Sequence, residues 1–187
     1  SYNVLIRSNS SSEAIFAGGF CTSGVAQITT NLSYAASPEL LALYDEENDL
    51  RYSSGKNSYF FQYNNGYYAS HRLVGASKLP GNSLVFSEVY LNKAEALALL
   101  GRESEAISTL QDMRGKRMSD AGTINETGEG LIKFIRNERR RELCGAGQRW
   151  FDLRRYAVHP TYPEKTTITH DYYEWDNGTA VLKKTYV

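Results

Sequence analysis

The fold is decided by the stretch Gly130-Leu-Ile-Lys-Phe-Ile-Arg-Asn-Glu-Arg-Arg-Arg-Glu-Leu-Cys-Gly-Ala-Gly-Gln-Arg-Trp-Phe-Asp-Leu-Arg-Arg-Tyr156. This stretch combines helical periodicity with many charged residues. It predicts a helix, a glycine-rich break and a second helix from Gln148 to Val158. At 100° per residue the first helix has one broad apolar face. That face consists of Leu131, Ile132, Phe134, Ile135 and Leu143.

Three charged residues, Glu138, Arg139 and Glu142, fall on this apolar face. Four polar residues fall outside it: Lys133, Asn137, Arg140 and Arg141. Because an unpaired buried ion strongly destabilises a fold, the sequence predicts a partly buried network of paired ions. The expected members of this network are Glu138, Arg139, Glu142, Arg114, Arg117, Arg149 and Asp152.

Glu138 and Glu142 lie one helical turn apart, and paired carboxylates could also be the acid and base of a glycosidase. That chemistry needs opposing walls of a cleft, whereas these two side chains project from one helix among arginines. A neighbouring arginine keeps a carboxylate ionised and makes it a poor proton donor. The pattern therefore favours a structural role, and we expect no catalytic residues.

The composition excludes several classes of function. The formal net charge is zero, with 21 basic and 21 acidic residues, which argues against binding nucleic acid or an anionic membrane. No apolar run is long enough to span a membrane. The three histidines and the two cysteines, Cys21 and Cys144, have no metal-ligand spacing, and no cofactor motif is present. We expect the cysteines to be buried free thiols, with a disulfide as the alternative.

Local patterns predict the remaining elements. Residues 1–35 are expected to be extended and loop-like. Ser37-Pro38 predicts the start of a short helix over 37–45. Asn64-Asn65-Gly66 and Asp176-Asn177-Gly178 each predict the turn of a β-hairpin. A helix capped by Asn82 or Ser83 is expected to run to Leu100, covered on more than one side, and a second helix to span 104–117.

Tyrosine is abundant, with 14 residues, and aromatic rings with polar tips suit surfaces that bind sugars or peptides. Two loop-borne groups could stack against sugar rings, while nearby amides bind the hydroxyls. The candidate ligand-binding residues are Tyr59, Tyr63, Asn64, Tyr67, Tyr68, Tyr172, Tyr173, Trp175 and Asn177. Each of these could instead be structural. Trp150 is expected to pack in the helical core.

An ordered set of motifs resembles the C-terminal portion of the SusD/RagB family. The set comprises Glu88-Val-Tyr-Leu-Asn-Lys-Ala-Glu-Ala96, Leu99-Leu-Gly101, Glu105-Ala106, Ile135-Arg-Asn-Glu-Arg-Arg-Arg-Glu-Leu143 and Gly147-Gln-Arg-Trp-Phe-Asp-Leu-Arg-Arg155. Gly101 to Ala106 also looks like the inner turn of a tetratricopeptide-type helical pair. The resemblance covers most of the chain.

This resemblance implies a mainly α fold, with tetratricopeptide-like helical pairs, long irregular loops and one or two small hairpins. The expected organisation is one domain over 1–187, with a loop-rich part at 1–81, a helical core at 82–158 and a tail at 159–187. It implies a non-catalytic, surface-exposed lipoprotein of the outer membrane in Bacteroidetes-type bacteria.

The resemblance also implies partners. The ligand would be a glycan or a peptide, delivered to a SusC-like TonB-dependent transporter. The membrane would be contacted only through a lipid anchor, and Cys21 is not expected to be the residue that carries it. No cofactor and no nucleic acid are implied. The alternatives are a helical-repeat interaction scaffold, a peptide-binding RagB-like member and a glycoside hydrolase.

Overall fold

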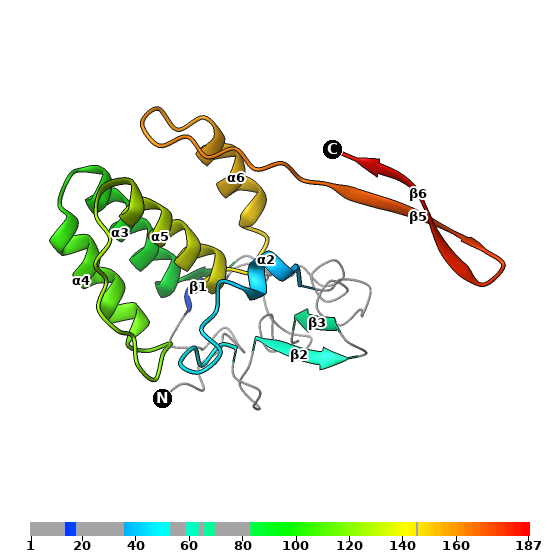
Figure 1. Cartoon of the computed structure of the whole chain (residues 1–187). Coiled ribbons are helices and arrows are strands. Elements are labelled where there is room, and N and C mark those ends of the chain that lie inside the picture. Colours follow the sequence, from blue (N-terminus) through cyan, green and yellow to red (C-terminus); the bar gives the residue numbers. More distant parts are fainter. Residues whose placement is uncertain (1–13, 18–35, 53–58, 64–65, 70–82, 145) are drawn as a thin grey trace. The chain divides into compact units, whose positions relative to one another are not determined.

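The chain divides into two units, residues 1–149 and residues 150–187, and each is described by itself. A computed structural model describes residues 14–17, 36–52, 59–63, 66–69, 83–144 and 146–187. These ranges are mainly helical, with three small two-stranded antiparallel sheets (Figure 1). The predicted fold class is therefore confirmed. The predicted single domain stays a prediction.

Three helices form the centre of the first unit: α3 (Phe86–Leu99), α4 (Glu103–Arg114) and α5 (Gly128–Glu142). All three pack against one another, and they lie side by side in Figure 1. Gly101, in the left-handed region at φ 73°, makes the turn between α3 and α4. The apolar residues buried between the helices are Val85, Leu91, Ala94, Leu97, Ala106, Leu110, Met113, Ile124, Leu131, Ile135 and Leu143.

Helix α3 starts later than the sequence predicts. Residues Ser83–Val85 form strand β4, which pairs antiparallel with β1 (Ala14–Ala17), and the helix begins only at Phe86. The pairing partner is far away in sequence, so local helix signals could not reveal it. Contacts with α4 and α5 cover α3 on two sides, as expected, while Phe86, Val89 and Tyr90 remain exposed.

A second, aromatic core lies beside the helices. Helix α2 (Pro38–Leu41) is capped by Ser37, whose Oγ accepts a hydrogen bond from the Leu40 amide at 3.3 Å. It is shorter than the predicted 37–45 helix, because turns follow it from Ala42. Strands β2 (Phe60–Tyr63) and β3 (Gly66–Ala69) confirm the predicted hairpin around residues 64–66. The rings of Tyr44, Tyr52 and Phe60 pack together in this core.

The second unit contains most of helix α6 (Arg149–Ala157) and a long hairpin of β5 (His170–Asp176) and β6 (Thr179–Tyr186). Positive φ angles at Asn177 and Gly178 (49° and 81°) give the tight turn that the sequence predicts. The prediction that Trp150 packs in a core is wrong, since its side chain is 60% exposed.

The buried face of α6 instead carries Asp152 and Tyr156. Arg155 explains why these polar side chains can be buried. Its Nε lies 3.0 Å from Asp152 Oδ1, and its guanidinium lies over the Tyr156 ring, 4.4 Å from the centroid. Polar groups that find partners in this way do not need water.

Candidate functional site

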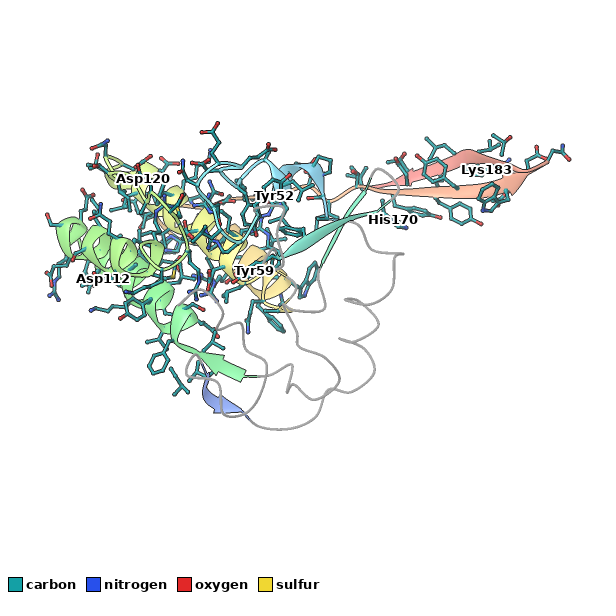
Figure 2. The ribbon with its side chains drawn as sticks, turned by 90° about the horizontal axis from the view of Figure 1, so that it is seen from below. Tyr52, Tyr59, Asp112, Asp120, His170 and Lys183 are labelled. Carbon is teal, nitrogen blue, oxygen red and sulfur yellow. The ribbon has the colours of Figure 1, made fainter. Side chains whose placement is uncertain are left out.

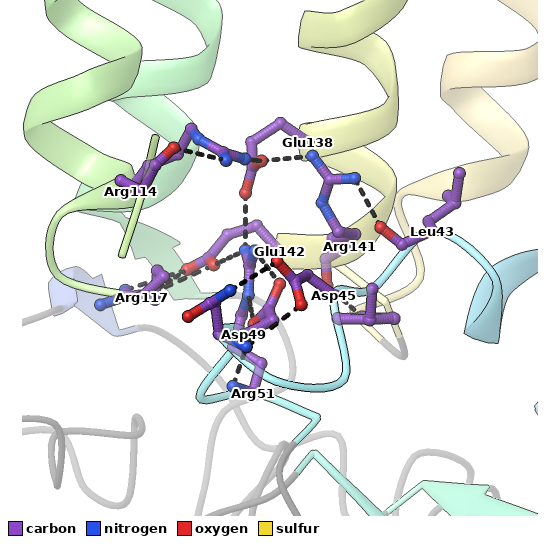
Figure 3. A network of polar contacts seen from close by, with 12 residues as sticks. Leu43, Asp45, Asp49, Arg51, Arg114, Arg117, Glu138, Arg141 and Glu142 are labelled. Carbon is purple, nitrogen blue, oxygen red and sulfur yellow. Dashed lines mark hydrogen bonds and ion pairs between the residues drawn. The ribbon is translucent and has the colours of Figure 1, made fainter. Parts of the chain in front are cut away.

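Glu138, on the last turns of α5, is the most completely buried carboxylate of the described residues. Its side chain is inaccessible to solvent, and three arginines surround it (Figure 3). Nη1 of Arg51 lies 2.8 Å from Oε1, and Nη1 of Arg114 lies 2.7 Å from Oε2. Arg141, one turn along the same helix, also donates to Oε2. The carboxylate is therefore held by arginines from the loop at 43–51, from α4 and from α5 itself.

Arg51 links all three buried carboxylates of this network. Its Nε and Nη2 donate to the two oxygens of Asp49 at 2.9 and 2.7 Å, in a bidentate arrangement. Its Nη1 lies 2.8 Å from Oε2 of Glu142 as well as from Glu138. This fork geometry is available to arginine and not to lysine.

Arg117 and Arg141 complete the network. Arg117 follows α4 and contacts Glu142, with its Nη2 2.9 Å and its Nε 3.0 Å from Oε1. Arg141 is buried, although periodicity places it outside the apolar face, and its hydrogen bonds to the Leu43 carbonyl and to Glu138 offset the cost of burying its charge. The loop at 43–51, the end of α4 and the end of α5 are thus tied together.

Backbone contacts strengthen this junction. The Leu50 amide donates to the Arg117 carbonyl at 3.0 Å, and Asp49 forms a β-bridge with Met118. Sequence reasoning missed Asp49, Arg51 and Arg141 as members. The signal available for two of them was Asp49-Leu-Arg51, whose charges are two residues apart just after a short helix.

The structure places the other expected network members elsewhere. Arg139 contacts α3, with Nη2 3.5 Å from Glu88 Oε1 and Nη1 donating to Asn92 Oδ1 at 2.8 Å. Asp152 pairs with Arg155 in the second unit. Among the described residues, Arg149 forms no ion pair. The expectation that Arg139 and Arg149 surround Glu138 and Glu142 is therefore corrected.

The electrostatics of this network favour permanently ionised carboxylates. Burial alone raises the pKa of Glu138, but Arg51, Arg141 and Arg114 outweigh it, so that the pKa lies below its usual range. Burial also raises the pKa of Glu142, but Arg117 and Arg51 lower it by more, so this pKa too lies below its usual value. A general acid needs a raised pKa, so neither carboxylate is suited to proton donation.

The two aromatic groups differ in accessibility. Tyr59 is only 4% exposed and belongs to the aromatic core, so it is not available to stack on a ligand, contrary to its selection as a candidate. Asn64 and the side chains of Tyr63, Tyr67 and Tyr68 lie outside the described residues. The rings of Tyr172, Tyr173 and Trp175 are exposed on β5, and Asn177 is exposed in the turn. Figure 2 shows the side chains of this hairpin, with His170 and Lys183 labelled.

Other kinds of site find little support in the described part of the chain. No cluster there of three or more His, Cys, Asp or Glu could hold a metal ion. No helix in the same ranges is long and apolar enough to cross a membrane. Cys144 is a free thiol that accepts a hydrogen bond from the Tyr44 hydroxyl at 3.4 Å, and burial raises its pKa to about 11. Cys21 lies outside the described residues.

A tetratricopeptide-like pair, a third helix packed against it and a buried arginine–carboxylate junction define the helical architecture of the first unit. The chain belongs to the SusD family, whose model matches residues 44–186. A similar curated protein is SusD-like protein P38 of Formosa agariphila, 39% identical over 77 residues. That match covers 36% of this chain and 15% of the relative.

Two solved structures share the fold. A SusD superfamily protein from Bacteroides thetaiotaomicron matches with a TM-score of 0.56 and 26% identity, over 71% of this chain and 34% of that chain. A SusD-like carbohydrate-binding protein from Bacteroides vulgatus matches with a TM-score of 0.57 and 20% identity, over 97% of this chain and 42% of that one. The chain therefore spans less than half the length of each of these relatives.

Proposed function

We propose that the chain binds glycans at the outer surface of the outer membrane, without cleaving them. In this proposal it presents them to a SusC-like TonB-dependent transporter for uptake. Membership of the SusD family supports this role, as does the structural neighbour described as carbohydrate-binding. The observation that carries it for this chain is the row of exposed aromatic rings on β5, in which Trp175 is 79% exposed.

Native affinity gel electrophoresis tests this proposal. The full chain is run through gels that contain one soluble polysaccharide each: α-glucan, mixed-linkage β-glucan, xylan or mannan. Retarded migration in at least one gel is the expected result. Equal migration in all gels, with and without polysaccharide, would contradict glycan binding.

A protein-interaction or peptide-binding scaffold is the second candidate. The exposed apolar side chains on α3, Phe86, Val89 and Tyr90, favour it, because such residues suit contact with another protein. Retention of an extended peptide in place of every polysaccharide would support a peptide-binding function. Binding of neither a polysaccharide nor a peptide would favour a protein-interaction scaffold without such a ligand.

A further inference from the structure

We propose that one face of the β5–β6 hairpin binds an extended polysaccharide segment of at least two consecutive pyranose units. This inference rests on the proposed glycan-binding function and assigns its site. Side chains of directly paired residues project from the same face of a hairpin. The pairing divides the hairpin into two different faces.

The first, called the tryptophan face, carries three residues of each strand: Asp171, Tyr173 and Trp175 from β5, and Ala180, Leu182 and Thr185 from β6. In a regular strand, Leu182 and Thr185 would point to opposite faces, because side chains alternate. The register of the hairpin shifts between Tyr172 and Tyr173. This β-bulge brings both Leu182 and Thr185 to the tryptophan face. The irregularity thus adds a polar end to an apolar surface.

The opposite face, called the lysine face, has its aromatic side chains engaged by charged neighbours. The Tyr172 hydroxyl donates to Glu174 Oε1 at 3.2 Å. The Lys184 ammonium lies over the Tyr186 ring, 4.6 Å from its centroid. Lys183 approaches Glu174 to 3.9 Å. The rings of this face are therefore less free to meet a ligand.

The two rings of the tryptophan face have no such partners. Among the described residues, neither the side chain of Tyr173 nor that of Trp175 forms a hydrogen bond, an ion pair or a ring contact. Trp175 lies opposite Ala180, which is too small to cover an indole, and Tyr173 is 52% exposed. Exposed aromatic faces attract the apolar faces of sugar rings. A polar pair follows at the end of the same face, where Thr185 Oγ1 donates to Asp171 Oδ1 at 2.5 Å.

The geometry of this face indicates the class of ligand. Tyr173 and Trp175 are two residues apart on one strand, so their Cα atoms are about 6.6 Å apart along it. That spacing suits two successive sugar units of an extended chain. Every residue of both strands is exposed except the partly exposed Val181, which is on the lysine face. An open surface of this kind accepts the interior of a polymer, whereas a walled pocket would select a chain end.

The test uses the full chain and the polysaccharide that retards it most among α-glucan, β-glucan, xylan and mannan. We expect Trp175→Ala and Tyr173→Ala each to weaken binding about tenfold, which is the loss of one stacking contact. The matched control on the lysine face, Tyr186→Ala, should stay within about twofold of the wild type. The free monosaccharide should not compete.

A fluorescence measurement covers the case in which a variant loses the hairpin. The chain has two tryptophans, so Trp150→Phe leaves Trp175 as the sole indole. Its emission should shift when the polysaccharide is added, because a sugar ring replaces water. Wild-type binding with no such shift, or undiminished affinity in both Trp175→Ala and Tyr173→Ala, would overturn this site while glycan binding stands. Competition by the monosaccharide at equal strength would overturn the extended ligand. A wild-type chain that binds no polysaccharide contradicts the proposed function and the site together.

Discussion

The Nη1 atom of Arg51 lies 2.8 Å from Oε1 of Glu138, and both side chains are completely buried. This contact joins a loop near the start of the chain to the end of α5. Arginine–carboxylate pairs in such surroundings contribute little net stability compared with apolar packing, but removing one partner leaves an uncompensated buried charge. The pair therefore fixes which segments meet, and its loss should be costly.

Arg51→Lys tests this relationship. Lysine keeps the charge but cannot donate to Asp49 and Glu142 while pairing with Glu138 from one planar fork. We expect the free energy of unfolding, measured by urea denaturation, to fall by about 3 kcal/mol. The matched control is Arg102→Lys, which alters an arginine whose pairing with Glu105 at 2.6 Å is exposed to solvent. That control should change stability very little, and equal effects of the two substitutions would contradict the buried network.

Stability should also depend on pH through Glu138 and Glu142. Their pKa values in the folded chain lie below the usual 4.5, because the arginines outweigh the effect of burial. The unfolded chain therefore binds more protons as the pH falls. The stabilisation is fully present above about pH 4.5 and is lost progressively as the pH falls toward the folded-state values.

Urea denaturation between pH 7 and pH 3 measures this loss. The variant Glu138→Gln removes one titrating carboxylate and should give a shallower dependence of unfolding free energy on pH. Identical slopes for the wild type and the variant would show that Glu138 has the same pKa in the folded and unfolded chain.

Glycine substitutions test the turn between α3 and α4. A Cβ atom at Gly101 would meet nothing within 4 Å, so Gly101→Ala acts only through the left-handed backbone at φ 73°. We expect a loss of about 1 kcal/mol. At Gly130, inside α5, an added Cβ atom would make only ordinary contact with Glu126, so Gly130→Ala should instead stabilise by about 0.5 kcal/mol. Thermal unfolding of both variants measures the difference, and a stabilising Gly101→Ala would contradict this turn.

Cys144 should react slowly in the folded chain. Burial raises its pKa from 9.0 to about 11, so the thiolate fraction at pH 8 falls about 100-fold, tenfold for each of two pH units. In a Cys21→Ser background, alkylation by iodoacetamide should be at least this much slower in buffer than in denaturant. A native rate equal to the unfolded rate would mean that the thiol is not buried beside Tyr44.

Local sequence signals predicted those parts of the fold that local physics determines. The 3.6-residue periodicity and flanking glycines identified α4, α5 and α6, and Asn177-Gly178 identified the terminal hairpin. The start of α3 was misplaced because Ser83–Val85 pairs with a strand far away in sequence. Apolarity favoured burial of Trp150, whereas Arg155 lets Asp152 and Tyr156 occupy the buried face of α6.

The same distinction applies to the candidate site. Placing Glu138 and Glu142 on an apolar face indicated that buried partners were needed. It could not indicate Arg51, because that arginine lies in a loop joined to α5 only through tertiary contacts. Likewise, composition singled out tyrosines without separating the buried Tyr59 from the exposed Tyr173. Which ring meets solvent depends on the pairing of β5 with β6 and on the packing beneath β2.

One variant tests whether the buried ion network stabilises the fold while a separate surface, the β5–β6 hairpin, binds the glycan. Glu138→Ala removes the carboxylate that three arginines share, and it lies outside the hairpin proposed to bind glycan. Urea denaturation and affinity electrophoresis on the same preparation should show the free energy of unfolding lowered by about 3–5 kcal/mol, with unchanged glycan affinity in the molecules that remain folded. A Glu138→Ala chain with wild-type stability, or a folded one that no longer binds the glycan, would contradict the claim that Glu138 stabilises the fold without taking part in glycan binding.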